Sequence, residues 1–290
     1  MAVSASEVLT LPAPAKVNLF LHVTGRRGDG YHTLETLLVP IDRGDRITLT
    51  LRVEPDIVRT GGVAEVAPEQ DLAARAARLL QRHCSVARGV AIDVDKHIPL
   101  GGGLGGGSSD AATVLLGLNR LWQLGLTRGA LMALALELGA DVPFFVFGEP
   151  ALARGVGEML ERFSLPPTWF AVLTPPVQVS TAAIFTAPEL THQTRSAKMN
   201  VFSEEYGGND LQAVAVSRFP EIAACLDALS REAGSGVPVR MSGSGSSVFA
   251  VFADESAAVQ TLSRAARAGT GAGFVARALD RHPLQHFAAP

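Results

Sequence analysis

Alternating apolar and polar positions near the start of the chain predict β structure. Residues 16–23 read KVNLFLHV, in which every second side chain is apolar. On a strand these apolar side chains share one face, and Lys16, Asn18 and His22 share the other. The sequence therefore places a lysine and an asparagine side by side on the polar face of a strand.

The same periodicities divide the rest of the chain. Alternation predicts further strands at residues 46–53, 91–96, 238–240 and 248–252. Apolar residues at helical spacing predict helices at residues 71–83, 110–122, 127–138, 210–233 and 255–268. Asp71 is placed to cap the first of these helices. The first hundred residues are therefore expected to be largely β, and helices alternate with strands in the C-terminal part.

A proline-rich stretch marks the expected passage between two domains. Residues 165–176 read LPPTWFAVLTPP, and domain boundaries often fall in segments of this composition. A chain of 290 residues that is 47% hydrophobic is also long enough to bury two cores. We therefore predict an N-terminal domain over residues 1–165 and a C-terminal domain over residues 166–290.

The formal net charge of −3 argues against nucleic acid and membrane partners. A protein that binds a nucleic-acid backbone or an anionic membrane carries a basic patch, and this sequence has no run of basic residues. Residues 1–14 lack the pattern of a signal peptide, and there is no apolar run of about 18 residues. We expect a cytoplasmic location, and a bound anion must be met by local groups.

The two cysteines predict neither a disulfide framework nor a zinc site. Cys84 and Cys225 lie far apart, and neither belongs to a CxxC pair or to a Cys/His cluster with zinc-like spacing. We interpret them as buried structural thiols and expect no protein metal site.

A glycine-rich loop carries the clearest chemical signal. Six of the seven residues in 101–107 are glycine, and the loop stands between a predicted strand and a predicted helix. Such a backbone can adopt positive φ angles, and the helix start supplies free N–H groups and the positive end of the helix dipole. Phosphate oxygens suit this site, and Ser108 and Ser109 can add hydroxyls to phosphate or to a magnesium ion. A branched side chain at Gly103 is expected to occupy space that phosphate needs.

Three other interpretations of the loop are weaker. A flexible linker does not usually separate a clean strand from a strongly apolar helix. Gly101, Gly103 and Gly106 satisfy the GxGxxG dinucleotide pattern, but no acidic residue follows about 20 positions later to hold a ribose. The Walker A pattern fails because no Gly-Lys-Ser/Thr follows. Phosphate binding outside the ordinary P-loop class is therefore favoured.

Four stretches of the chain together resemble the motifs of the GHMP kinases. They are PAKVNLFLHVTGRRGDGYHTLETL at 14–37, IPLGGGLGGGSSDAATVLLGLN at 98–119, LGADVPFF at 138–145 and RMSGSGSSVFAVF at 240–252. The likeness runs from about residue 14 to about residue 284, in the expected order and spacing.

The resemblance implies an α+β fold and an ATP site. The expected GHMP kinase fold has two domains, an N-terminal domain like domain 2 of ribosomal protein S5 and a C-terminal ferredoxin-like domain, with the catalytic cleft between them. Lys96 is expected near the adenine end of ATP. The residues expected to contact the phosphates and the rest of the nucleotide are Pro99, Leu100, Gly101, Gly102, Gly103, Leu104, Gly105, Gly106, Gly107, Ser108 and Ser109.

By the same resemblance, Lys16 and Asp141 match the catalytic pair of the family. Phosphoryl transfer to an alcohol needs a group that accepts the hydroxyl proton, and Asp141 is the candidate base. An ammonium at Lys16 could lower the pKa of that carboxyl and offset charge on the transferring group. The alternatives are a helix-capping or turn aspartate and a solvated strand lysine. The resemblance favours catalysis for both.

The resemblance also implies a substrate that carries a cytidine diphosphate group. The residues expected to hold it are Asn18, Tyr31, His32, Thr181 and Phe185. The aromatic rings would suit stacking on a pyrimidine, although lone aromatic residues are commonly half-buried core. The second glycine-rich turn, MSGSGSS at 241–247, is interpreted as a backbone wall near the phosphates or substrate, and a plain hairpin connection is its alternative.

The sequence thus predicts an enzyme that transfers a phosphoryl group from ATP to a hydroxyl of a small molecule. Mg²⁺ is the expected ion, held mainly by the nucleotide phosphates. One alternative is a GHMP kinase that acts on another sugar or small alcohol. The other is a non-catalytic nucleotide sensor on the same scaffold. The sequence assigns no oligomeric state.

Overall fold

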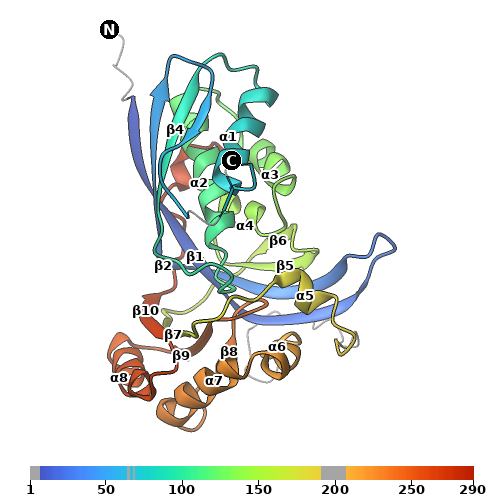
Figure 1. The fold of residues 1–290 in the computed structure, drawn as a ribbon, viewed down its shortest axis with the longest axis vertical. Coiled ribbons are helices and arrows are strands. Elements are labelled where there is room, and N and C mark those ends of the chain that lie inside the picture. The colour runs from blue at the N-terminus through green and yellow to red at the C-terminus, as the bar shows by residue number, and fades with distance from the viewer. Residues whose placement is uncertain (1–6, 64–65, 68, 191–206) are drawn as a thin grey trace.

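Two β-sheets, each packed against helices, form the framework of the molecule (Figure 1). The computed structural model describes residues 7–63, 66–67, 69–190 and 207–290. In Figure 1 the first sheet and its helices occupy the upper part, and the second sheet with its helices lies below.

The first sheet is built on a long antiparallel hairpin. Its spatial order is β3-β4-β2-β5-β6, with β1 paired to β2. The strands are β1 (Val8–Arg26), β2 (His32–Arg52), β3 (Ile57–Arg59), β4 (Gly89–Asp95), β5 (Ala151–Gly155) and β6 (Met159–Arg162). The β1–β2 register shifts at three points, between Pro14 and Lys16, between Asn18 and Phe20, and between Val23 and Gly25. Bulges of this kind bend a strand and re-aim its side chains.

The predicted apolar face of residues 16–23 is confirmed, and it serves two cores. Val17 and Leu19 are buried in a cluster that includes residues of the second sheet. Leu21 and Val23 are buried in the core of the second domain instead. Since β1 contributes to both cores, the polar side chains on its other face are fixed relative to both domains.

Four helices pack with the first sheet: α1 (Leu72–His83), α2 (Gly106–Leu121), α3 (Arg128–Leu136) and α4 (Val142–Phe147). The predicted cap at Asp71 is confirmed, since its Oδ1 accepts a hydrogen bond from the Ala74 amide at 2.9 Å. The helix predicted at 110–122 begins four residues earlier, at Gly106. Part of the glycine-rich loop is therefore the first turn of α2.

The second sheet has the antiparallel order β10-β7-β9-β8. Its strands are β7 (Trp169–Thr174), β8 (Val239–Met241), β9 (Val248–Phe252) and β10 (Ala272–Arg277), and its helices are α5 (Thr181–Phe185), α6 (Gln212–Arg218), α7 (Pro220–Ala233) and α8 (Glu255–Ala265). Counted in chain order, the strands lie as 4-1-3-2, with helices between the first and second and between the third and fourth. This is the ferredoxin-like arrangement that the resemblance implied.

The end of the chain returns to the first domain. After β10, Leu284 and Ala288, which flank the 3₁₀ turn Gln285–Phe287, are buried in the core between the first sheet and its helices. The Arg128 guanidinium donates to the carbonyl of Ala288 at 3.2 Å and to that of Val146 at 2.7 Å. Figure 1 accordingly places the C-terminus beside α1 and α2. The last residues of the predicted C-terminal domain, 166–290, therefore pack on the N-terminal domain.

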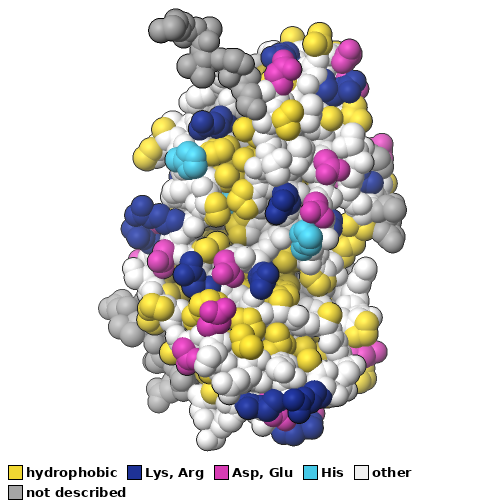
Figure 2. Space-filling model, turned by 90° about the vertical axis from the view of Figure 1, so that its left-hand side faces the viewer, with side chains coloured by type: hydrophobic (Ala, Val, Ile, Leu, Met, Phe, Trp, Pro, Cys, Tyr) yellow, Lys and Arg dark blue, Asp and Glu magenta, His cyan; other side chains and the backbone are white. Residues whose placement is uncertain are grey.

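Charges of both signs lie on the surface in Figure 2, and neither cysteine is fully exposed. Basic and acidic side chains are interspersed over the face drawn in Figure 2. Within the described ranges, no helix has both the length and the apolar character needed to cross a membrane. Cys225 is buried, Cys84 is half-buried, and burial raises the pKa of both thiols.

Candidate active site

A cleft of about 700 Å³ lies between the two domains. Its walls come from the β1–β2 hairpin, the glycine-rich loop, the start of α4, α5 and the turn between β8 and β9. With the exception of Ser109, every residue that the sequence analysis assigned to a site lines this cleft: Lys16, Asn18, Tyr31, His32, Lys96, Pro99, Leu100, Gly101, Gly102, Gly103, Leu104, Gly105, Gly106, Gly107, Ser108, Asp141, Thr181 and Phe185.

The glycine-rich loop joins β4 to α2 through three left-handed residues. Gly101, Gly103 and Gly105 have φ angles of +63°, +70° and +71°, which only glycine adopts readily. Gly105 occupies the N-cap of α2 and supplies no side-chain cap. The first-turn amides of a long helix therefore open toward the cleft with the positive end of its dipole.

The turn at 241–247 closes the back of this loop. The Ser246 and Ser247 amides donate to the carbonyls of Gly101 and Gly102 at 3.1 and 3.0 Å. The Ser242 hydroxyl donates to the carbonyl of Gly103 at 2.9 Å. The turn thus connects β8 to β9 and also directs the loop carbonyls away from the cleft.

This packing corrects the reason given for glycine at position 103. A Cβ on Gly103 would lie 2.0 Å from the backbone oxygen of Ser242, not in the open cleft. A Cβ on Gly107 would meet nothing closer than Leu72 Cδ1 at 3.7 Å. Gly107 also lines the cleft, so it is the position where a larger side chain would compete with a ligand.

The Lys16 ammonium is held at the junction of β1, the loop and α4. It is 3% exposed, and its Nζ donates to Asn18 Oδ1 at 2.5 Å and to the Gly103 carbonyl at 2.9 Å. Asp141 Oδ2 lies 3.6 Å from the same Nζ. Burial lowers the pKa of Lys16, and the Asp141 carboxylate opposes that shift. Lys16 is therefore a buried lysine, and the solvated strand lysine is excluded.

Asp141 stands at the start of α4 but does not cap it. Its side chain makes no hydrogen bond to the helix amides, and it is 42% exposed in the cleft. The capping alternative is therefore excluded. An accessible carboxylate beside a buried ammonium can accept a proton from a ligand hydroxyl.

Asn18 is itself fixed from behind. Its Nδ2 donates to Thr36 Oγ1 at 2.8 Å, and the Thr36 hydroxyl donates to the carbonyl of Phe20 at 2.5 Å. This chain orients the Asn18 amide so that its oxygen faces Lys16. Sequence reasoning missed Thr36, because a threonine in a strand carries no distinctive signal.

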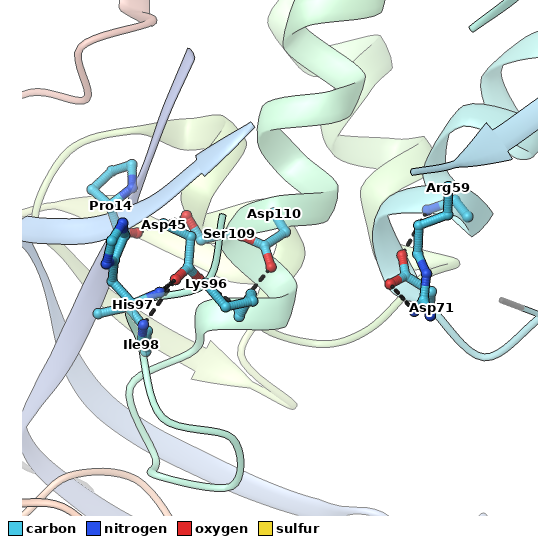
Figure 3. Close-up of polar contacts among 10 residues, drawn as sticks. Pro14, Asp45, Arg59, Asp71, Lys96, His97, Ile98, Ser109 and Asp110 are labelled. Atoms are coloured by element: carbon cyan, nitrogen blue, oxygen red, sulfur yellow. Dashed lines mark hydrogen bonds and ion pairs between the residues drawn. The ribbon is translucent and has the colours of Figure 1, made fainter. Parts of the chain in front are cut away.

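Lys96 is bound by two buried carboxylates, shown in Figure 3. Its Nζ pairs with Asp45 Oδ2 and, at 2.8 Å, with Asp110 Oδ2. Burial alone would lower the pKa of Lys96, but the Asp110 and Asp45 charges outweigh burial and raise it. Burial raises the pKa of Asp110 to about 7, with Lys96 opposing and Asp45 adding to the shift. Asp110 Oδ1 is buried and has no hydrogen-bond partner among the described atoms.

Aromatic and hydroxyl groups form the other end of the cleft. The rings of His32 and Phe185 stack with their centroids 5.5 Å apart at an angle of 29°. Tyr31 is 67% exposed at the tip of the hairpin. Thr181 Oγ1 lies 2.8 Å from the Ser244 hydroxyl, which joins α5 to the β8–β9 turn. This end can present both an apolar ring surface and hydroxyl groups to a ligand.

Ser109 differs from the other predicted residues. It is fully buried, and its hydroxyl donates to the carbonyl of Pro14 at 2.6 Å, so its side chain joins α2 to β1. Ser108, one residue earlier, is half-buried and lines the cleft. The two neighbouring serines point in different directions because α2 has already begun at Gly106.

Comparison with known proteins identifies the family. Residues 71–149 match the model of the GHMP kinases N terminal domain, and residues 189–271 match that of the GHMP kinases C terminal domain. A Thiobacillus denitrificans protein named 4-diphosphocytidyl-2-C-methyl-D-erythritol kinase is 56% identical, covering 95% of this chain and 97% of its own. A protein of the same name from Nitrosospira multiformis is 51% identical, covering 99% and 96%.

Solved structures agree with this. A crystal structure of 4-(cytidine 5'-diphospho)-2C-methyl-D-erythritol kinase matches with a TM-score of 0.76 and 36% identity, over 93% of this chain and 99% of that one. Homoserine kinase from Cytophaga hutchinsonii shares the fold, with a TM-score of 0.68 at 17% identity, over 97% and 98% of the two chains. The fold and the site define a phosphotransferase. The chain belongs to the GHMP kinases, and its phosphoryl donor is ATP.

The Asp110 carboxyl predicts a specific pH dependence of stability. Between pH 4 and 7 the folded state holds a proton on Asp110 that the unfolded state has released, because the folded pKa is about 7. Stability from this group is then complete below pH 4 and is lost as pH rises toward 7, at up to about 1.4 kcal/mol per pH unit. The variant Asp110→Asn lacks this loss. Urea unfolding of both proteins at pH 5, 6, 7 and 8 should show the variant gaining relative stability up to pH 7, and a constant difference would contradict the shift.

Proposed function

We propose that this chain phosphorylates the 2-hydroxyl of 4-diphosphocytidyl-2-C-methyl-D-erythritol, giving the 2-phosphate and ADP. This reaction belongs to the non-mevalonate route to isoprenoid precursors. The relatives at 51–56% identity carry the name of this kinase over nearly their whole length. The observation that carries the proposal is the Lys16–Asp141 pair, 3.6 Å apart, beside the glycine-rich loop.

The proposed transfer uses the two walls of the cleft. The first-turn amides of α2 and the loop hold the ATP phosphates, so that the γ-phosphorus faces Asp141. The acceptor hydroxyl lies between that phosphorus and the Asp141 carboxylate. As the new P–O bond forms and the bond to ADP breaks, the hydroxyl proton passes to Asp141, which releases it to water afterwards.

Lys16 supplies a fixed positive charge for this step. Its Nζ is held by Asn18 and the Gly103 carbonyl, so it needs little reorganisation when charge shifts during transfer. Asp141 Oδ2 lies 3.6 Å from the same Nζ, so the ammonium is placed beside both the proposed base and the transferring group. Asn18 therefore acts on the reaction through Lys16.

The aromatic end of the cleft would receive the cytidine. His32 and Phe185 already stack on each other, so a pyrimidine has no space between them in this arrangement. It would stack on the outer face of the pair or separate the two rings. Tyr31 is exposed at the hairpin tip, within the same wall, and can cover the base. Thr181 and Ser244 offer hydroxyls to the polar groups of the ligand.

Mg²⁺ fits this cleft as an ion held largely by the nucleotide. Among the described residues there is no group of three or more His, Cys, Asp or Glu that could form a protein cage. The Ser108 hydroxyl, which lines the cleft at the first turn of α2, is the oxygen that would help to hold the ion. When bound, Mg²⁺ would neutralise part of the negative charge of the phosphates.

A panel of acceptors tests the substrate. The purified protein with ATP and Mg²⁺ should phosphorylate 4-diphosphocytidyl-2-C-methyl-D-erythritol, and it should leave mevalonate, homoserine and galactose largely unchanged, as measured by coupled ADP release. Activity on one of the other alcohols alone would assign a different GHMP kinase. ATP binding without transfer to any acceptor would indicate a nucleotide sensor.

The variant Asp141→Asn tests the base. Loss of a positioned base lowers kcat by about 10²–10⁴-fold, and ATP affinity should stay within about threefold of wild type because the loop is untouched. Steady-state kinetics at saturating acceptor would measure both. Asp227→Asn, an exposed aspartate on α7, makes the same change in charge away from the cleft and should have no effect. An Asp141→Asn enzyme with wild-type kcat would refute the assignment.

The variant Gly107→Val tests the phosphate site. Valine at this position should project into the cleft and weaken ADP binding about tenfold or more, measured by calorimetry, with the melting temperature nearly unchanged. Gly129→Val is the matched control, because Gly129 is also the second residue of a helix but is exposed on α3, where a Cβ meets only Thr127 Oγ1 at 4.0 Å. Equal ADP affinity in both variants would show that the phosphates do not bind at this loop.

A further inference from the structure

Asp45 is a buried carboxylate that the proposed reaction does not use. It lies on β2, one residue before Arg46, which forms the first β2–β4 pair along β2 with Asp95. Its side chain is completely shielded from solvent. Burying a carboxylate is unfavourable by several kcal/mol unless charges and hydrogen bonds compensate. The contacts of Asp45 therefore show what this position provides.

Those contacts are directed at the start of the glycine-rich loop. Asp45 Oδ1 accepts hydrogen bonds from the backbone amides of His97 at 2.6 Å and Ile98 at 2.8 Å. Its Oδ2 pairs with the Lys96 ammonium (Figure 3). These three residues connect the end of β4 to Pro99, where the loop begins. One carboxylate thus fixes all three residues of the connection.

The same carboxylate lies against the end of the loop. A Cβ on Gly106, the first residue of α2, would lie 3.2 Å from Asp45 Oδ2. Asp110, one turn further along α2, shares Lys96 with Asp45. The entry and the exit of the loop therefore both pack on Asp45, and the distance between them is set by this side chain.

Electrostatics explains why Lys96 belongs to this arrangement. A bare carboxylate beside the first turn of α2 would repel the phosphates that the turn is proposed to bind. The Lys96 ammonium pairs with Asp45 and cancels most of that repulsion. Lys96 is committed to two carboxylates, so its charge offsets acidic side chains around the nucleotide.

We propose that Asp45 is a positioning residue for nucleotide binding, which holds both ends of the glycine-rich loop so that its amides meet the phosphates. The inference rests on the proposed function for the identity of the nucleotide. It concerns nucleotide affinity and not the proton transfer at Asp141. Asp45 does not line the cleft.

Two variants separate the contacts of Asp45. Asp45→Ala removes both the acceptor of the two amides and the partner of Lys96. Asp45→Asn keeps an oxygen for the two amides, but it removes the charge and replaces the acceptor of Lys96 with an NH2 group. We expect ADP dissociation constants raised about tenfold or more for Asp45→Ala and about threefold for Asp45→Asn. The KM for the cytidine acceptor, at saturating ATP, should change less than about twofold in both.

Glu35→Ala is the matched control. Glu35 is also a buried carboxylate on β2, 1% exposed, and its Oε2 pairs with Arg154 Nε at 3.1 Å, but it does not line the cleft. Its loss should lower stability without changing the affinity for ADP. The comparison separates general loosening of β2 from loss of the loop anchor.

The outcomes are distinct. ADP affinity in Asp45→Ala within twofold of wild type, an equal loss in Glu35→Ala, or a loss confined to kcat would each overturn the inference. If Asp45→Ala does not fold, Asp45→Asn decides, and an unchanged ADP affinity in it overturns the inference as well. ADP binding is measured without acceptor, so it does not depend on the proposed reaction. If the wild-type protein binds ADP but does not phosphorylate the cytidine acceptor, only the proposed function is refuted.

Discussion

An anion site made of backbone amides needs its carbonyls turned away, and this constraint organises the molecule. In the glycine-rich loop the carbonyls of Gly101, Gly102 and Gly103 accept hydrogen bonds from the 241–247 turn, which belongs to the other domain. Buried carbonyls must find donors, and these donors leave the amides of the first turn of α2 directed into the cleft. The proposed ATP site therefore depends on the contact between the domains.

The same contact fixes the proposed catalytic pair, Lys16 and Asp141, relative to the loop. Lys16 Nζ donates to the Gly103 carbonyl, and the backbone N–H of Asn18 donates to the Ser242 hydroxyl at 3.2 Å. One hydrogen-bonded assembly thus joins β1, the loop and the β8–β9 turn. A rearrangement between the domains would move the ammonium and the phosphate site together. The geometry of the transfer is in this way coupled to the packing of two separate cores.

Much of the fold could be predicted because its elements have strong local patterns. The strand at 248–252 and the cap at Asp71 follow from alternation and from a capping residue that the structure uses. β5 and β10 were not predicted, and their partners β2 and β7 lie far away in the sequence. The first half of β2 and the short strand β6 were also missed, although each pairs with a neighbouring strand. The early start of α2 was missed because glycine has low helix propensity, and here the packing of the loop overrides that preference.

The site illustrates the same limit. Motifs identified the glycine-rich loop and, through the family, Lys16 and Asp141, but only the fold brings that pair to 3.6 Å. Asp45 had no signal, because an aspartate after Gly44 in DRGDR reads as a turn residue. Its partner Lys96 is on another strand connection, and the bond between them exists only in the sheet.

The proposed site for a polyanion lies beside several carboxylates. Three carboxylates, those of Asp45, Asp110 and Asp141, surround the proposed phosphate site, and each lies within 4 Å of Lys16 or Lys96. With Asp110 protonated, as its pKa of about 7 allows near neutrality, the Lys96 cluster carries no net charge. Attraction for ATP must then come from the helix start, the loop amides and the accompanying cation. Because those amide dipoles are fixed by hydrogen bonds to the second domain, the positions of Asp45 and the 241–247 turn matter more for nucleotide binding than the net charge of the chain.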